Sequence, residues 1–298
     1  MTILNFDVEE ALSSMRERGF YVAHNALDKL TLSDLQTAFN IYMNSGPTSG
    51  AEFGISELES GIHWVDHPLT INSSVIRIAL NELLLSLSSS YLNQPSTFSY
   101  SFAYRSLPIP GMSGDVQAKT IPEGVFKGWH SDANLSCPTR GYRCLVAMLY
   151  LTDVNEGDGG VWIVDKSHSF GGLKRAWTPK EFEQYDSFEV TAKAGSLVIF
   201  DMEMIHRAGT PTGEKSRDII RFMYAPSGGY TQHMLIPMHY IPKDLTPSQI
   251  KAANFDSYAH DSLRLSKNND RKKWDEKPVE SLAYRIKRRI RNYILNHI

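Results

Sequence analysis

A histidine and an aspartate stand two residues apart, at His130 and Asp132. On a β-strand, side chains at positions i and i+2 point to the same face, so the imidazole and the carboxylate can reach one common point. Two histidines and one carboxylate form the facial triad that holds non-haem Fe(II) and leaves coordination positions open for other ligands. The pair therefore predicts two thirds of an iron site that needs a second histidine from elsewhere in the chain.

His206 is the best candidate for that histidine because it follows the apolar, strand-like segment 197–200. Arg217 comes eleven residues later, after a turn that contains Pro211 and Gly213. A strand, a turn and a returning strand predict that His206 and Arg217 lie on neighbouring antiparallel strands and face one interior. An arginine there can bind a carboxylate through two hydrogen bonds. It would suit the distal carboxylate of 2-oxoglutarate, whose other end would chelate the metal.

Other chemically capable residues have simpler interpretations. We interpret His168 as a structural histidine near the rim of the site. His63 and His67 would share a face only in a helix, where they could hold a second metal. Their loop-like surroundings favour substrate contact instead. Cys137 and Cys144 are most simply buried thiols.

The composition excludes several classes of protein. Hydrophobic residues make up 42% and charged residues 21% of 298 residues, which is ordinary for a soluble globular chain. A net charge of -2 gives no general attraction to nucleic acid. No apolar run approaches the roughly 20 residues that span a bilayer, and the acidic start does not resemble a signal peptide. Two cysteines without a C-x-x-C pair suit a reducing cytoplasm, where we expect the protein.

The first third of the chain, residues 1–95, is predicted to be mainly helical. Hydrophobic periodicity and helix stop signals predict three helices and one strand in this part of the chain. The helices are Val8–Arg18, ended by Gly19; Thr31–Met43, capped by Thr31 or Ser33; and Val75–Leu92; the strand is Phe20–Ala23. The Gly- and Ser-rich stretch Ser45–Gly61 is predicted to be a loop.

Short strands with turn signals are predicted to fill the core, about residues 96–227. Aromatic residues alternate with small ones at Phe98, Tyr100, Phe102 and Tyr104, which predicts a strand with one aromatic face. That face either belongs to the core or lines a substrate pocket at its end. Further strands are predicted at 143–152, 161–164, 188–192, 196–200 and 219–224.

Helices followed by short strands predict a mainly β fold with flanking helices, built on a jelly-roll or cupin-like barrel. A βαβ rhythm and a G-x-G-x-x-G motif are both lacking, which argues against a dinucleotide-binding fold. The Pro- and Gly-containing stretch Leu107–Phe126 leads into His130 and predicts a lid over the site.

We expect one domain over residues 1–298, with a C-terminal extension at 228–298. Between Arg271 and Ile298 there are nine Lys or Arg and three acidic residues, and apolar residues recur at helical spacing. This pattern predicts a basic amphipathic helix. The helix would pack on its own domain or on a second subunit, or it would bind an anionic membrane surface.

Three segments resemble the phytanoyl-CoA dioxygenase (PhyH) family. They are Phe126-x-x-Trp129-His130-x-Asp132, the Gly159-Gly160 turn before Ser167-His168, and Gly195-x-Leu197-x-x-Phe200-Asp201 ahead of His206. The resemblance covers roughly residues 21–224. It implies an Fe(II)- and 2-oxoglutarate-dependent oxygenase on a double-stranded β-helix.

Residue by residue, the resemblance also implies roles. The implied iron ligands are His130, Asp132 and His206. Arg217 would anchor 2-oxoglutarate; Arg221 has the same strand parity, and only the spacing typical of the family selects Arg217. The family commonly has a serine two residues after the distal histidine, where this chain has Ala208.

The implied reaction is hydroxylation of a small-molecule substrate by O2, with succinate and CO2 as co-products. The same iron site would also serve desaturation, ring closure or epoxidation. Two alternatives of other classes stay open: a non-catalytic barrel that binds a ligand, and a cupin-like metalloenzyme that does not use 2-oxoglutarate.

Overall fold

The computed structural model describes most of the first 253 residues. The described ranges are 3–45, 55–59, 62–65, 67–108, 128–132, 143–170, 176–209, 211, 214–227, 236 and 238–253. The chain divides into two compact units, Met1–Asn254 and Phe255–Ile298, and every described residue belongs to the first. Cys137, nearly all of the predicted lid and the predicted basic C-terminal helix lie outside the described residues.

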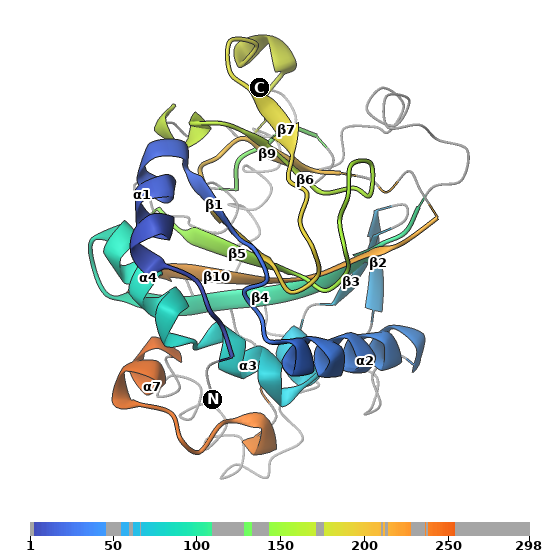
Figure 1. The fold of residues 1–298 in the computed structure, drawn as a ribbon, viewed down its shortest axis with the longest axis vertical. Helices are drawn as coiled ribbons and strands as arrows, with labels where there is room; N and C mark the ends of the chain where they lie inside the picture. The colour runs from blue at the N-terminus through green and yellow to red at the C-terminus, as the bar shows by residue number, and fades with distance from the viewer. Residues whose placement is uncertain are drawn as a thin grey trace, which may run out of the picture. The chain divides into compact units, whose positions relative to one another are not determined.

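Two antiparallel sheets form the centre of the first unit (Figure 1). The larger sheet has the order β1-β8-β5-β10-β4-β3-β2 and the smaller β7-β6-β9. Their strands are β1 Phe20–Ala23, β2 Ile55–Glu59, β3 Ile62–Val65, β4 Ser96–Ser106, β5 Leu145–Tyr150, β6 Val161–Val164, β7 Ser187–Glu189, β8 Leu197–Asp201, β9 His206–Ala208 and β10 Arg217–Pro226. The predicted mainly β jelly-roll core is confirmed.

One buried cluster fills the space between the sheets. Alternate side chains of β5 and β8 point into it, including Met148, Tyr150 and Phe200. The smaller sheet contributes Val161 and Ile163 from β6. This alternation is what two packed sheets require, since every second residue of a strand faces the partner sheet.

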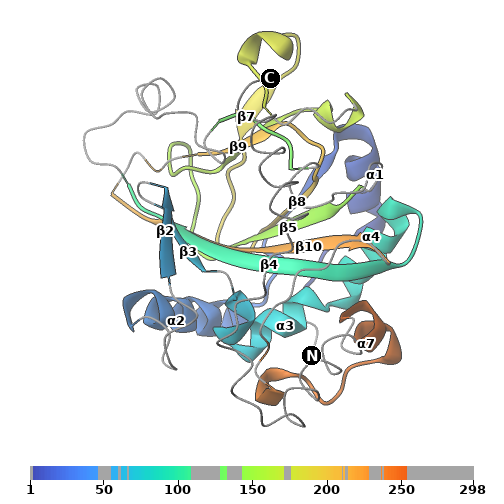
Figure 2. The ribbon, with the colours of Figure 1, turned by 180° about the vertical axis from the view of Figure 1, so that it is seen from behind.

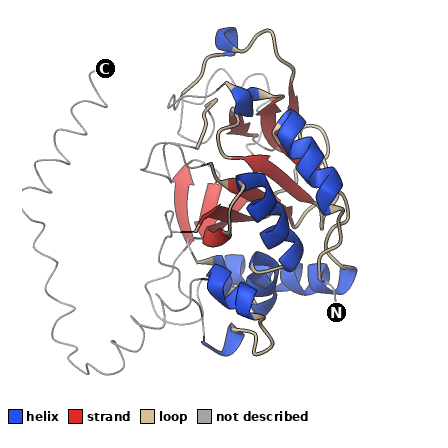
Figure 3. Ribbon diagram, turned by 90° about the vertical axis from the view of Figure 1, so that its left-hand side faces the viewer, coloured by secondary structure: helices blue, strands red, loops and turns tan. Residues whose placement is uncertain are grey.

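Helices cover the outer face of the larger sheet (Figures 2 and 3). They are α1 Val8–Arg18, α2 Lys29–Ser45, α3 Ser73–Ala79, α4 Glu82–Leu92 and α7 Pro247–Ala253. Short 3-10 turns are η1 Pro68–Thr70, η2 Ser167–Ser169, η3 Pro179–Glu181 and η4 Met238–Tyr240. The Tyr224 hydroxyl donates to the Ala79 carbonyl and ties β10 to α3. With both of its faces covered in this way, every residue of β10 is buried.

The first helix has the predicted limits. The Asp7 side chain accepts from the amides of Glu9 and Glu10 and caps its start. Gly19 ends it at φ +86°, a left-handed conformation that glycine adopts without strain. A side chain at Gly19 would also collide with His168, because a Cβ there would lie 2.5 Å from its Nδ1.

Two helix predictions need correction. The second helix begins at Lys29, because Asp28 rather than Thr31 or Ser33 satisfies its first turn: its carboxylate accepts from the amide and hydroxyl of Thr31. The predicted helix Val75–Leu92 is two helices, since the Asn81 side chain accepts from Leu83 and starts α4. The stretch Ser73–Leu92 is apolar enough to span a membrane by composition, but it is broken here and about half buried against the fold.

Two strand predictions also need correction. The predicted loop Ser45–Gly61 contains β2, which pairs with β3 and extends the edge of the larger sheet. The register of β4 against β10 shifts between Met223 and Tyr224. An extra residue in one strand turns the following side chains to the other face. Phe98 therefore packs near Tyr224 on the helix side, while Phe102 and Tyr104 face the smaller sheet.

Candidate metal centre

His130 and His206 lie opposite each other on adjacent backbone segments. The His130 amide donates to the His206 carbonyl at 2.9 Å, and the His206 amide donates back at 2.8 Å. The two ring centroids are 4.4 Å apart. His130 forms an isolated β-bridge rather than a full strand, but the bridge places both imidazoles on one side.

Asp132 completes the cluster from the turn that follows the bridge. Its amide donates to the Met202 carbonyl at 3.0 Å, which holds the turn against the end of β8. Its Oδ1 lies 3.4 Å from His130 Nε2, and its Oδ2 lies 3.5 Å from His206 Nε2. One ligand atom from each of the three buried residues lies within 4.8 Å of the other two. The predicted convergence of the three side chains is present.

The backbone sets which ring nitrogen of each histidine faces the cluster. His130 Nδ1 lies 2.7 Å from the Gly128 carbonyl oxygen, and His206 Nδ1 lies 2.9 Å from that of Met204. A carbonyl can only accept, so Nδ1 carries the proton in each ring and Nε2 keeps its lone pair. Both lone pairs therefore face Asp132, as metal ligation requires.

The charges in the cluster also favour a divalent cation. Burial opposes ionisation of Asp132, but the positive charge of Arg221 beside the carboxylate outweighs it. This charge holds the pKa of the carboxyl well below its usual range. Burial, followed by the neighbouring His130, lowers the pKa of His206. One ionised carboxylate and neutral imidazoles are the donor set that Fe(II) takes in a facial triad, so the residues fit this metal.

Arg217 is a buried cation at the start of β10. Its side chain is 1% exposed, and its Nη2 donates to the Ser106 hydroxyl at 3.2 Å. Its Cζ lies 5.4 Å from the Tyr104 ring centroid. Among the residues that the structure describes, no carboxylate pairs with Arg217, and its Nε has no hydrogen-bond partner. A buried charge without a counter-charge is costly, so this guanidinium is suited to an anionic ligand.

Arg221 points into the same interior and already has a carboxylate partner. Its Nη2 contacts Asp132 Oδ2 directly. Its Cζ lies 5.0 Å from the Phe102 ring centroid and 5.9 Å from that of Phe200. The two arginines have the same strand parity, so their different partners, which the sequence does not show, separate their roles.

The strands that carry His206 and Arg217 pair differently from the prediction. β9 pairs with β6 in the smaller sheet, whereas β10 pairs with β4 and β5 in the larger one. The two residues are therefore on separate sheets rather than on neighbouring strands. Both side chains are buried, as expected, because the two sheets pack face to face.

A cavity lies beside the two histidines and Arg221. Its apolar lining consists of Ile62, Trp64, Phe102, Tyr104, Met148 and Val161. Trp64 stacks on Phe102 with ring centroids 4.0 Å apart and an interplanar angle of 24°. The end of the aromatic face of β4 therefore lines a pocket beside the candidate metal centre. Ala208 also lines this cavity and has no hydroxyl to offer a ligand.

The segment around His63 has a different geometry from the one a second metal site needs. Ile62–Val65 is strand β3, so His63 and His67 do not share a helix face. Within the described part of the chain, the His130, Asp132 and His206 cluster is the one group with metal-ligating geometry. Residues of β3 do contact the cavity, through Ile62 and Trp64.

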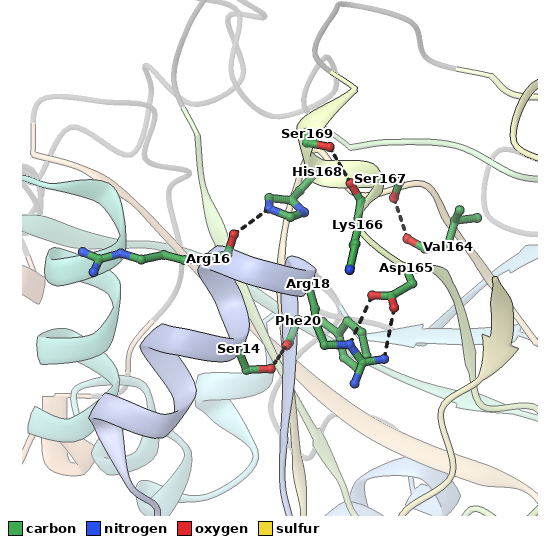
Figure 4. Close-up of polar contacts among 10 residues, drawn as sticks. All are labelled: Ser14, Arg16, Arg18, Phe20, Val164, Asp165, Lys166, Ser167, His168 and Ser169. Carbon is green, nitrogen blue, oxygen red and sulfur yellow. Dashed lines mark hydrogen bonds and ion pairs between the residues drawn. The ribbon is translucent and has the colours of Figure 1, made fainter. Parts of the chain in front are cut away.

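Ser167 positions the cluster in a way that its sequence context alone does not reveal. Its hydroxyl donates to the Val164 carbonyl at 2.7 Å (Figure 4) and accepts from the Ile205 amide at 2.8 Å. It thus links the end of β6 to the residue before His206. In the sequence, the one indication of a role for Ser167 was its position next to His168 in the Ser-His motif.

His168 has the structural role expected of it. The ring lies against α1, and Figure 4 shows its Nε2 directed at the Arg16 carbonyl, 3.3 Å away. Arg18 pairs with Asp165 at 3.2 Å and fastens the residues just before the 3-10 turn η2 to the helix. Cys144 is buried, as predicted.

Comparisons with known proteins agree with this geometry. The family model for phytanoyl-CoA dioxygenase (PhyH) matches residues 15–219. A search of the curated proteins found no match. Among solved structures, the carbocyclase SnoK from nogalamycin biosynthesis is 17% identical, with a TM-score of 0.59, and the match covers 83% of this chain and 94% of that chain.

Two further solved structures are similar in fold. The epimerase SnoN, in complex with Fe3+, alpha ketoglutarate and nogalamycin RO, is 16% identical with a TM-score of 0.58 over 81% of this chain and 92% of that chain. EvdO2 from Micromonospora carbonacea var. aurantiaca, complexed with 2-oxoglutarate, is 16% identical with a TM-score of 0.55 over 81% of this chain and 100% of that chain. At these identities, the likeness establishes the shared fold.

Proposed function

The chain belongs to the phytanoyl-CoA dioxygenase family, and we propose that His130, Asp132 and His206 are the iron ligands through which it oxidises a small molecule. As a member of this family, the protein is an Fe(II)- and 2-oxoglutarate-dependent oxygenase. The observation that carries the assignment of ligands is the convergence of two imidazole Nε2 atoms and one carboxylate in a buried cluster.

We propose that Arg217 binds the distal carboxylate of 2-oxoglutarate. Its burial and its lack of a carboxylate partner among the described residues support this role. A guanidinium pairs well with a carboxylate because its planar donors match the two oxygens. The hydroxyl of Ser106 keeps the guanidinium in place, at 3.2 Å from Nη2.

The surrounding residues prepare the site for oxidation. When bound, iron and 2-oxoglutarate supply the activation of O2, with succinate and CO2 as co-products. The backbone carbonyls of Gly128 and Met204 keep the Nδ1 protons in place, so both Nε2 atoms remain free to ligate. Arg221 keeps the Asp132 carboxylate ionised, and the apolar cavity wall excludes water.

Hydroxylation is the first candidate outcome for the substrate. A second candidate is another oxidative outcome, such as desaturation, ring closure or epoxidation. Ring closure has a precedent among the similar folds, since SnoK is a carbocyclase. The fold alone does not choose among these reactions.

Two further proposals concern the location of the protein and its C-terminal extension. We propose a cytoplasmic location because the sequence has only two cysteines and no C-x-x-C pair. Self-association or membrane contact through the basic C-terminal helix is a prediction from sequence about residues outside the described ranges.

Metal analysis of single-residue variants tests the ligand assignment. His130→Ala, Asp132→Ala and His206→Ala should each lose bound iron and the 2-oxoglutarate-dependent release of succinate. His168→Ala is a matched control, because His168 is also a buried histidine but contacts α1 instead of the cluster. If all three variants keep the wild-type iron content, the ligand assignment is wrong. If the iron-loaded wild type releases no succinate under air, the non-catalytic barrel is the better description.

A further inference from the structure

Arg221 has more hydrogen-bonding capacity than its protein partners use. The side chain is 4% exposed and lines the cavity beside the two histidines. A guanidinium carries five N–H donors. Within the described part of the chain, Asp132 is the one acceptor of its hydrogen bonds, and its Nε has no partner. Donors therefore remain free on a buried cation at the wall of the pocket.

Among the residues that the structure describes, the buried charges near the candidate metal centre do not cancel without a further anion. Asp132 balances one of the two buried arginines, Arg217 and Arg221, and one positive charge is left. The charges of Fe(II) and 2-oxoglutarate are equal and opposite, so the proposed loaded site keeps this surplus. Tyr104 and Tyr150 do not offset it, because burial raises the pKa of both, that of Tyr150 to about 12. A buried surplus charge is costly, so a monoanion is the missing partner.

The rest of the cavity is built for an apolar body. The rings of Trp64 and Tyr104 are nearly parallel, with an interplanar angle of 3° and centroids 6.0 Å apart. The Phe102 ring stacks on both of them. Ile62, Met148 and Val161 complete an aliphatic lining. Such a wall stabilises a flat apolar group through dispersion and through removal of water from its surface.

From these observations we propose that the substrate is an apolar monocarboxylic acid and that Arg221 binds its carboxylate. The inference rests on the proposed function, since it assumes that Arg217 is occupied by 2-oxoglutarate. A carboxylate is favoured over a phosphate ester because one positive charge is in surplus and a phosphate ester carries up to two negative charges. The carboxylate held at Arg221 would set which part of the apolar body lies beside the metal centre.

Binding of matched acids and amides to the loaded protein tests this proposal. The protein is saturated with Fe(II) and 2-oxoglutarate in the absence of O2, so that an added acid cannot occupy the Arg217 site. Calorimetry then compares 2-naphthoate with 2-naphthamide, and 4-phenylbutyrate with 4-phenylbutyramide. We expect at least one acid to bind about tenfold or more tightly than its amide, which is the effect of one charge-assisted hydrogen bond. If no acid in the set binds more tightly than its amide, the proposal is overturned.

Substitution of each arginine of β10 in turn shows which residue causes the preference for acids over amides. Arg221→Gln should bring the acid-to-amide ratio to about one. Its 2-oxoglutarate binding is measured separately, on protein saturated with Fe(II). Arg217→Gln is the matched control with the same charge change, and it should weaken 2-oxoglutarate binding by about tenfold or more. Iron content is measured for each variant, because Arg221 contacts Asp132. The wild-type comparison keeps the test decisive if a variant does not fold.

The outcomes distinguish a failure of the Arg221 proposal from a failure of the proposed 2-oxoglutarate-dependent function. A preference for acids that persists in Arg221→Gln overturns the role of Arg221 and leaves the 2-oxoglutarate assignment intact. Loss of 2-oxoglutarate binding in Arg221→Gln, with normal binding in Arg217→Gln, overturns both, because the two arginines would then have been assigned in reverse.

Discussion

His130 and His206 exchange two backbone hydrogen bonds, each amide donating to the carbonyl of the other residue. In an antiparallel pair, residues bonded in this way lie directly opposite each other, and their side chains leave the backbone on the same side. The spacing of the two imidazoles is therefore fixed by the backbone rather than by loop conformation. Met202 extends the arrangement by accepting from the Asp132 amide. The proposed iron site is thus preorganised by main-chain contacts.

Ser167→Ala should destabilise both the fold and the proposed metal site. The hydroxyl satisfies the buried Val164 carbonyl and Ile205 amide, so its loss leaves two polar groups without partners. We expect a loss of about 1 to 3 kcal/mol in the free energy of unfolding, measured by urea titration. Iron affinity, measured against a competing chelator, should fall as well, because Ile205 precedes His206.

Ser169→Ala is the matched control for this prediction. Ser169 belongs to the same 3-10 turn, but its hydroxyl bonds to the Lys166 carbonyl at the surface, as Figure 4 shows. Its removal should change the free energy of unfolding by less than about 0.5 kcal/mol. Equal effects of the two substitutions would argue against a positioning role for Ser167.

Arg217→Ala should raise the KM for 2-oxoglutarate about 10- to 100-fold, since hydrogen bonds to charged groups contribute about 1.5 to 3 kcal/mol each. Ala208 offers no hydroxyl to compensate. Arg217→Lys should restore only part of the affinity, because lysine keeps the charge but lacks the planar fork. Iron content should remain near that of the wild type. A KM that does not change in either variant would contradict the assignment.

The features that the sequence predicts well are local. The helix Val8–Arg18 has a cap, an amphipathic period and a stop glycine, all within the segment itself. The strands β5, β6 and β8 are short apolar runs between turn signals. The convergence of His130, Asp132 and His206 was predicted from the two-residue spacing, the apolar run before His206 and the family resemblance. It is present even though the strand around His130 is reduced to a bridge.

The features that the sequence does not predict depend on distant partners. One extra residue in β4 moves Phe98 to the helix side, although the alternating pattern places it with Phe102. The pairing of β9 with β6 rather than β10 is also a long-range choice. Arg217 and Arg221 look equivalent in sequence, and the acceptor that distinguishes them, Asp132, lies 89 residues from Arg221.

Gly209→Ala should disrupt the end of β9. A Cβ on Gly209 would lie 2.3 Å from the carbonyl oxygen of Gly160 and 2.7 Å from the carbonyl carbon of Gly159, and backbone atoms cannot move aside easily. We expect a loss of about 1 to 3 kcal/mol in stability, typical of overpacking, together with weaker iron binding three residues from His206. Thermal unfolding with and without iron measures both effects. A melting temperature equal to that of the wild type would show that the turn can relax.

Asp201 should make the stability of the protein depend on pH in a specific direction. The carboxyl is fully buried, accepts from the Tyr91 hydroxyl at 2.5 Å and from the Glu203 amide at 2.8 Å, and lies 3.8 Å from Arg143. Burial raises its pKa above 3.8, and the hydrogen bonds from Tyr91 and Glu203 oppose the rise only in part. The folded state therefore holds this proton more tightly than the unfolded state does.

A group of this kind contributes stability that is fully present below its unfolded pKa, near 3.8, and is lost as the pH rises through the folded value. Asp201→Asn removes the titration while keeping a polar side chain that can bond to the Tyr91 hydroxyl. The free energy of unfolding of this variant, relative to the wild type, should therefore increase as the pH rises from about 4 towards 7. Urea titrations of both proteins at a series of pH values measure the difference. Parallel curves for the two proteins would mean that Asp201 has the same proton affinity in the folded and unfolded chains.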